Sequence, residues 1–206
     1  MRLVAVSKTF PATAVRQAYA TGVRDFGESR VQEAIAKQEE LADLTDICWH
    51  FIGRLQSNKA KKAIAHFDWI HTCDRLKLAE RLDRLAAELG KTPQVCLQVK
   101  LLPDPSKQGW TPEELAADLA TLDTYRHLKV QGLMTILPQG LTPDEARNAF
   151  QDLRDYANQW QQEPWQRLQF QALSMGMSND YPLAIEAGAT MVRLGRIIFG
   201  DRPTLT

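Results

Sequence analysis

Residues 1–26 read MRLVAVSKTFPATAVRQAYATGVRDF, and this stretch decides the fold. The apolar run Leu3–Val6 predicts a buried strand, and the spacing of apolar residues over Ala14–Thr21 predicts an amphipathic helix. A second short segment, Arg24–Phe26, predicts another strand. A strand, a helix and a strand in this order favour two parallel strands joined by a right-handed crossover.

The same alternation continues along the rest of the sequence. We expect further strands near Trp49–Ile52, Trp69–Thr72, Val95–Val99, Val130–Thr135, Gln169–Leu173 and Met191–Leu194. We expect further helices at Val31–Leu41, Lys59–His66, Leu76–Leu89, Pro112–Tyr125, Pro143–Trp160 and Tyr181–Glu186. Eight strands separated by seven helices predict an α/β protein, a parallel (β/α)8 barrel of the TIM type that forms a single domain over residues 1–206.

A doubly wound open sheet is the alternative arrangement of the same elements. It would need a ligand crevice where the strand order reverses. No GxGxxG motif follows the first predicted strand, which counts against it. The chain is shorter than the roughly 250 residues typical of a barrel, and we expect no helix ahead of Leu3 to cover the barrel bottom.

The charge balance excludes some classes of partner. Lys plus Arg number 25 and Asp plus Glu number 25, so the formal net charge is zero. A zero balance gives no overall field to attract nucleic acid or an anionic membrane. No window reaches the roughly 18 apolar residues of a membrane span, and the N-terminus lacks the pattern of a signal peptide. We therefore expect a cytoplasmic protein that binds neither nucleic acid nor membrane.

Cysteine and histidine give no sign of a metal site. The three cysteines, Cys48, Cys73 and Cys96, are odd in number and too widely spaced for a zinc unit, so we expect buried small side chains. No two histidines are four residues apart, the spacing of a helical metal site. We expect isolated core or rim side chains at His50, His66, His71 and His127.

Lys8 follows Ser7, which is the residue directly after the first predicted strand. In a barrel the functional residues lie just after the C-terminal ends of the strands. Lysine is seldom buried, and desolvation at this place would lower its pKa and expose a nucleophilic amine. The alternative is a lysine whose ammonium group extends to solvent at the barrel rim.

Small residues follow the last two predicted strands. Ser174-Met175-Gly176-Met177-Ser178 comes after the seventh strand, and Gly195 comes after the eighth. Such residues let backbone N–H groups converge on an anion, and barrels frequently bind phosphate with these two loops. The alternative is a turn in which Ser178 or Asn179 caps the following helix.

Arg193 lies within the eighth predicted strand. Alternation places it on the same face as Met191 and opposite Val192 and Leu194. Strand eight pairs with strand one in a closed barrel, so we expect Arg193 and Lys8 to be near neighbours at one rim. Two cations there favour an anionic ligand, such as a phosphorylated aldehyde held by a Schiff base at one end. The alternative is an arginine paired with an acid inside the barrel.

Taken together, these residues resemble the pyridoxal phosphate homeostasis proteins. The matched blocks run in order from the first strand to Pro203. They are Val4-Ala5-Val6-Ser7-Lys8, Phe26-Gly27-Glu28, Val31-Gln32-Glu33, His50-Phe51-Ile52-Gly53, Gln56-Ser57-Asn58-Lys59, Gly132-Leu133-Met134-Thr135, Leu173-Ser174-Met175-Gly176-Met177-Ser178 with Asp180, and Arg193-Leu194-Gly195 with Phe199-Gly200. The family is similar to the N-terminal barrel domain of alanine racemase without the second, β-rich domain.

The resemblance implies a cofactor site. It implies pyridoxal 5′-phosphate (PLP) as a Schiff base on Lys8, contact between Arg193 and the ring nitrogen, and phosphate contacts around the two loops. The candidate cofactor-binding residues are Lys8, Ser174, Met175, Gly176, Ser178, Arg193 and Gly195. The chain departs from the family at Ser29 and Lys100, where Asn is usual, and at Arg196, where Thr is usual.

The resemblance implies a non-enzymatic role in PLP (vitamin B6) homeostasis, with apo PLP-dependent enzymes as recipients of the cofactor. The alternative is a PLP-dependent amino-acid racemase. Racemisation needs a base on each face of the substrate carbanion. Lys8 supplies one, and we expect the domain that brings the other to be absent. We therefore expect a monomeric carrier with no catalytic residue.

Overall fold

The computed structural model describes residues 1–104 and 107–201. Its strands form a closed parallel barrel in the order β1 to β8, and β1 pairs with β8 to close it. The strands are β1 Arg2–Val6, β2 Asp25–Glu28, β3 Cys48–Phe51, β4 Trp69–Cys73, β5 Gln94–Gln98, β6 Lys129–Met134, β7 Ala172–Ser174 and β8 Met191–Leu194. The predicted (β/α)8 barrel is confirmed. A single domain over residues 1–206 stays a prediction, because residues 105–106 and 202–206 lie outside the described part.

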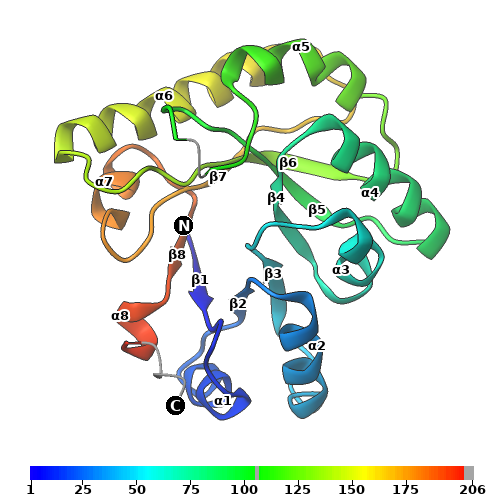
Figure 1. The fold of residues 1–206 in the computed structure, drawn as a ribbon, viewed down its shortest axis with the longest axis vertical. Helices are drawn as coiled ribbons and strands as arrows, with labels where there is room; N and C mark the ends of the chain where they lie inside the picture. Colours follow the sequence, from blue (N-terminus) through cyan, green and yellow to red (C-terminus); the bar gives the residue numbers. More distant parts are fainter. Residues whose placement is uncertain (105–106, 202–206) are drawn as a thin grey trace.

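Helices follow the strands and surround the barrel (Figure 1). They are α1 Ala12–Ala20, α2 Val31–Glu40, α3 Ala60–His66, α4 Leu76–Leu89, α5 Pro112–Leu122, α6 Pro143–Gln161 and α7 Tyr181–Glu186. The structure adds a short helix, α8 Arg196–Phe199, and a 3₁₀ turn, η1 Ser57–Lys59, before α3. Thr111 and Thr142 each form a capping box with the Glu three residues later, which accounts for the sharp starts of α5 and α6.

Strand β7 is shorter than its sequence predicts. The expected strand Gln169–Leu173 begins only at Ala172. The backbone N–H of Phe170 donates to the side-chain Oε1 of Gln161 at 2.8 Å. That N–H is therefore not available to a neighbouring strand, and regular pairing starts two residues later.

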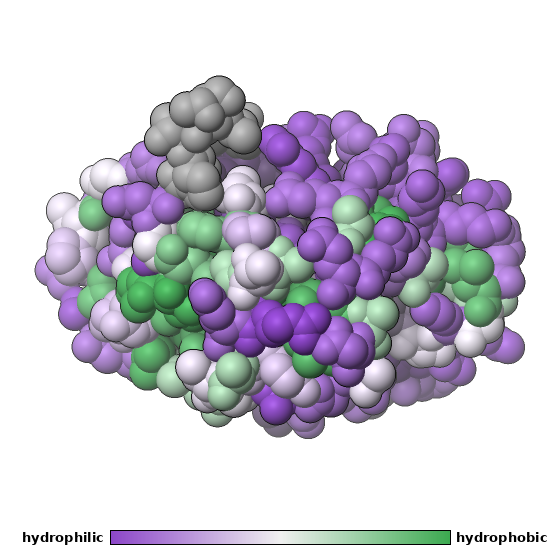
Figure 2. Space-filling model, turned by 90° about the horizontal axis from the view of Figure 1, so that it is seen from below, coloured by the Kyte–Doolittle hydropathy of each residue, from purple (hydrophilic) through white to green (hydrophobic). Residues whose placement is uncertain are grey.

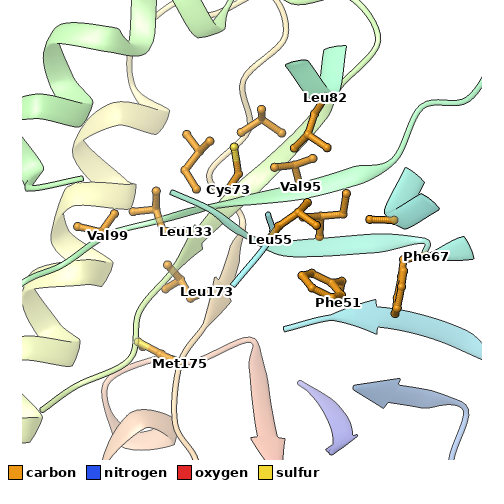
Figure 3. Close-up of a cluster of buried hydrophobic side chains, with 14 of the residues drawn as sticks. Phe51, Leu55, Phe67, Cys73, Leu82, Val95, Val99, Leu133, Leu173 and Met175 are labelled. Carbon is orange, nitrogen blue, oxygen red and sulfur yellow. The ribbon is translucent and has the colours of Figure 1, made fainter. Parts of the chain in front are cut away.

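Apolar side chains fill two separate regions. The larger region lies between the strands and the helices, and Figure 3 shows part of it, including Leu82 of α4 and Val95 of β5. Val192 and Leu194 belong to this outer cluster. An inner cluster contains one buried residue from each of the five strands β4 to β8, namely Trp69, Cys96, Met134, Ala172 and Met191. The predicted alternation within β8 is therefore confirmed.

The surface mixes polar and apolar areas (Figure 2). The large apolar side chains that are exposed are Met1, Leu3, Ile185 and Ile197. Scattered exposed apolar residues are normal on a globular protein. Within residues 1–104 and 107–201, no helix has the length and apolar character that crossing a bilayer requires.

Candidate functional site

A cavity of about 770 Å³ lies at the C-terminal ends of the strands. Of the predicted site residues, Lys8, Ser178, Arg193 and Gly195 line it. Three others do not line it and are instead buried, namely Ser174, Met175 and Gly176. The basic side chains of the lining are Lys8, Arg193 and Arg196, against one carboxylate, so the cavity suits an anionic ligand.

The backbone around Lys8 is held by contacts on both sides. Ser7 is fully buried, and its Oγ donates to Glu28 Oε1 at 2.6 Å. The Nζ of Lys37 donates to the backbone oxygen of Ser7 at 2.9 Å. On the other side, the N–H of Thr9 donates to Glu33 Oε1 at 2.7 Å. Because β2 and α2 carry these partners, two elements fix where the half-buried Lys8 side chain starts.

Thr9 adopts a backbone angle φ of 70°, in the left-handed region that a β-branched residue rarely occupies. Such a conformation costs on the order of 1–3 kcal/mol and persists only where the surroundings enforce it. The contact with Glu33 supplies that constraint. The strained turn sends the chain away from β1 directly after Lys8.

Glu28 and Lys37 form a buried ion pair behind this turn. Lys37 Nζ lies 2.5 Å from Glu28 Oε1, and both side chains are almost completely buried. Burial raises the pKa of the Glu28 carboxyl, while Lys37 and Ser7 oppose that rise. The second oxygen, Oε2, has no hydrogen-bond partner among the described residues. No local sequence pattern indicated this pair, although Glu28 lies in a matched block and Lys37 follows four residues after Glu33.

The loop after β7 is only partly arranged for an anion. Gly176 has φ of 90°, and a Cβ there would meet Ala184 Cβ at 2.7 Å, so glycine is required. The N–H of Met177 donates to Asp180 Oδ1 at 2.6 Å and is therefore already occupied. Ser178 is half-buried at the cavity wall. The first N–H groups of α8, next to Gly195, have no acceptor within their own helix.

Arg193 lies deeper in the barrel than its predicted place. Its register partner is Val4, four residues before Lys8, so the expected position beside Lys8 at the rim is wrong. The two residues meet instead as parts of one cavity wall. Because Arg193 is level with Val4 and its side chain lies on the inner face of β8, it reaches the interior and is only 3% exposed.

The buried guanidinium has neutral partners. Nη1 donates to the backbone oxygen and the Oγ of Ser174 at 2.6 and 2.7 Å, and Nη2 donates to the backbone oxygen of Thr135 at 2.8 Å. No carboxylate of the described residues lies within ion-pair distance, so the alternative of an internal acid partner is wrong for this part of the chain. Burial lowers the pKa of Arg193 to about 10.

Two histidines predicted to be isolated are joined inside the barrel. His50 Nδ1 and His71 Nε2 are 2.8 Å apart, and both side chains are fully buried. His50 also contacts Asp25, and His71 contacts Ser174. The two residues are 21 positions apart, so only the closure of the barrel reveals the pair.

One group of residues has metal-ligand chemistry. Asp25, Cys48 and His50 place potential ligand atoms within 4.8 Å of one another. Asp25 Oδ1 is already hydrogen-bonded to His50 Nε2 at 2.8 Å and lies 3.5 Å from Nη1 of Arg2. A neighbouring guanidinium opposes a second cation, so this group is better described as a hydrogen-bonded cluster.

The departures from the family fall at different distances from the cavity. Arg196 lines it, and its Nη2 donates to Asn179 Oδ1 at 2.7 Å. Lys100 lines a separate cavity of about 620 Å³. Ser29 lines neither cavity; its backbone oxygen abuts Gly53, where a Cβ would lie 2.1 Å away.

The family model for the alanine racemase N-terminal domain matches residues 1–203. At the level of sequence, the chain is 55% identical to the pyridoxal phosphate homeostasis protein of Synechocystis, over 98% of this chain and 92% of that protein. It is 46% identical to the protein of the same name from Pseudomonas aeruginosa, over 97% and 84% of the two chains.

Solved structures agree. PipY of Synechococcus elongatus with PLP bound is 55% identical, covers 97% of this chain and 92% of its own, and superposes with a TM-score of 0.93. Alanine racemase of Clostridium difficile shares the fold at 17% identity and a TM-score of 0.73, with all of this chain covered and 56% of its own. The resemblance seen in the motifs is confirmed: this chain belongs to the family of pyridoxal phosphate homeostasis proteins, built on the barrel of the alanine racemase N-terminal domain.

Proposed function

We propose that this protein binds PLP in the cavity beside Lys8 and serves PLP homeostasis as a carrier of the cofactor. One observation carries the proposal: the half-buried Lys8 lines the same cavity as Arg193, a buried arginine that has no carboxylate partner among the described residues. The names of the Synechocystis and Pseudomonas relatives support it, as does the PLP-bound structure of PipY.

The residues present fit the groups of PLP. Bound PLP supplies an aldehyde that reacts with a primary amine and an aromatic ring that can accept electrons. Lys8 would hold the aldehyde carbon through its Nζ. Arg193 would donate to the ring nitrogen, while Ser178, Gly195 and the cationic Arg196 would surround the phosphate. Ser174, Met175 and Gly176 would support these residues from behind, because they do not line the cavity.

The cavity favours a carrier over a racemase. Among its described lining residues, the only carboxylate is Asp180, which already accepts from the N–H of Met177. Tyr181 and Cys73 carry side chains that can act as bases, but neither lines the cavity, and burial raises the pKa of the Cys73 thiol. A permanently charged Arg193 also disfavours a proton on the ring nitrogen, which weakens electron withdrawal. We place this carrier in the cytoplasm as a monomer that passes PLP to apo-enzymes.

The test is to load the purified protein with PLP, reduce it with borohydride and map the adduct by mass spectrometry. We expect the label on the peptide that contains Lys8. Lys8→Ala should lose both the label and the absorption band of the lysine-bound cofactor while its circular dichroism stays native. Labelling of another lysine, or an unfolded Lys8→Ala, would contradict the assignment.

A second measurement separates carrier from enzyme. The loaded protein should not exchange the alpha proton of alanine in deuterium oxide, and it should reactivate an apo PLP enzyme on mixing. Turnover of a free amino acid at about 1 per second or faster would establish an enzyme instead.

A further inference from the structure

Four hydrogen bonds connect the carboxylate of Asp25 to the guanidinium of Arg193 through the barrel interior. Asp25 Oδ1 lies 2.8 Å from His50 Nε2, and His50 Nδ1 lies 2.8 Å from His71 Nε2. His71 Nδ1 lies 2.7 Å from Ser174 Oγ, which accepts from Arg193 Nη1 at 2.7 Å. We call these five residues the interior chain.

The interior chain starts near the barrel bottom and ends at the cavity. Asp25 is the first residue of β2, and its side chain is 22% exposed. Arg193 lines the cavity at the C-terminal ends of the strands. The three residues between them, His50, His71 and Ser174, are completely buried. The interior chain therefore links the barrel bottom to the cavity without passing through solvent.

The chemistry of the two ends fixes the direction of every hydrogen bond. The ionised carboxylate of Asp25 can only accept, so a neutral His50 carries its proton on Nε2, donates to Asp25 and accepts at Nδ1. A neutral His71 then donates from Nε2 to His50 and accepts at Nδ1 from the hydroxyl of Ser174. The guanidinium of Arg193 has only donors, so the Ser174 oxygen accepts from Arg193.

The charge states agree with this direction. Burial lowers the pKa of His50 and lowers the pKa of His71 well below its ordinary value, so both rings are neutral near pH 7. The contact with His50 and the nearby Arg2 lower the pKa of Asp25, although its partial burial opposes them. The interior chain thus has a fixed cation at one end, an anion at the other and aligned dipoles between.

Aromatic and apolar side chains surround the two imidazole rings. Trp69 stacks on His50 with ring centroids 5.8 Å apart and lies 5.8 Å from the ring of His71. Trp69 belongs to the inner apolar cluster, which also contains Cys96 and Met134. Buried polar groups in such a place are costly unless each is satisfied, and in the interior chain each is.

We propose that Asp25, His50 and His71 are positioning residues for Arg193. By taking the Ser174 proton, His71 leaves the lone pairs of that oxygen facing Arg193 and so fixes the orientation of the guanidinium toward the cavity. Asp25 balances the buried positive charge from the far end. The inference rests on the proposed function, since the role it describes is to present Arg193 to the PLP ring.

The first test needs no cofactor. In ¹⁵N-labelled apo-protein at pH 7, the imidazole signals of His50 and His71 should both show the neutral ring protonated at Nε2. The Arg193 side-chain N–H signals should show slow rotation and should average in His71→Leu. A cationic ring, a proton on Nδ1 of either histidine, or an unchanged Arg193 in His71→Leu would overturn the proposal.

The second test measures the effect on PLP. Asp25→Asn keeps the shape of the side chain but removes its charge, and it touches neither Arg193 nor the cavity. We expect it to raise the Kd for PLP about tenfold and to shift the absorption maximum of the bound cofactor. His71→Leu should do the same.

Asp46→Asn is the matched control. Asp46 lies at the same end of the barrel, two residues before β3, but bonds outward to Tyr19 and Arg24. It should change the Kd less than twofold. Wild-type affinity and spectrum in a folded Asp25→Asn, or an equal loss in Asp46→Asn, would overturn the positioning role. Wild-type protein that binds no PLP would refute the proposed function, and the apo-protein signals would still decide on the interior chain.

Discussion

The Nζ of Lys37 donates a hydrogen bond to the backbone oxygen of Ser7 at 2.9 Å. The buried Lys37 therefore holds the residue that directly precedes Lys8. The two lysines have different roles as a result. Lys37 is almost completely buried and paired with Glu28, whereas Lys8 is half-buried at the cavity. The buried ion pair belongs to the support of the site and stands outside its lining.

Lys37→Met should destabilise the protein strongly. It leaves Glu28 buried without its cation, a change that typically costs about 3–5 kcal/mol. The double variant Lys37→Met/Glu28→Gln should recover part of this loss, because no unpaired charge remains. Urea unfolding of the three proteins would measure it, and a double variant no more stable than Lys37→Met would contradict the explanation.

Gly176→Ala should cost more stability than Gly22→Ala. Both glycines have positive φ, at 90° and 99°, so both substitutions share the backbone strain. Only at Gly176 does the new Cβ also meet another residue, Ala184, at 2.7 Å. We expect about 1 kcal/mol at Gly22 and an overpacking cost of about 1–3 kcal/mol in addition at Gly176. Equal thermal midpoints for the two variants would show that the loop after β7 yields to the extra methyl group.

The protein should lose stability as the pH falls from 7 to 5.5. Burial lowers the pKa of His50 and His71 in the folded state, so below about pH 6.5 the unfolded chain binds protons that the folded chain does not. The free energy of unfolding therefore keeps its full value above about pH 6.5. As the pH drops further it decreases, by at most about 1.4 kcal/mol per pH unit for each histidine. Urea unfolding across this range should give a shallower slope for His71→Gln. Identical slopes would mean that His71 does not contribute.

Arg193→Glu should unfold or severely destabilise the protein. The carboxylate would face the backbone oxygens of Ser174 and Thr135, which now accept from the guanidinium. Loss of donors to buried acceptors costs on the order of 1–3 kcal/mol each, and an unpaired buried charge adds to this. Arg193→Lys keeps the charge and should fold, with PLP affinity lowered because one ammonium replaces a planar fork. Thermal denaturation and PLP titration would separate the two effects, and a stable Arg193→Glu that binds PLP would contradict them.

The sequence predicted the barrel because each strand and helix carries its own local pattern. The capped starts at Thr111 and Thr142 are examples, since threonine, proline and the acid three residues later act within one turn. Strand β7 was misjudged because its start depends on the side chain of Gln161, the last residue of the preceding helix α6. The local pattern of residues 169–173 does not show that Gln161 occupies the N–H of Phe170.

The site was predictable where residues follow strand ends. Lys8, Ser178, Arg193 and Gly195 share a cavity because a parallel barrel brings all strand ends to one face. The depth of Arg193 and the contact between the two buried histidines depend on register and closure. Those are relations between strands, and no single stretch of sequence carries them.

The pairing of Val4 with Arg193 also bears on synthesis of the chain. The strand that leads to Lys8 leaves the ribosome before the other seven strands, whereas its neighbour in the closed barrel, β8, leaves after them. Until β8 emerges, β1 lacks one of its two partners and the cavity lacks a wall. Contacts between such distant residues form slowly. A chain that has not yet reached β8 lacks Arg193 and Gly195, so the cavity lining is complete only after this strand has been made.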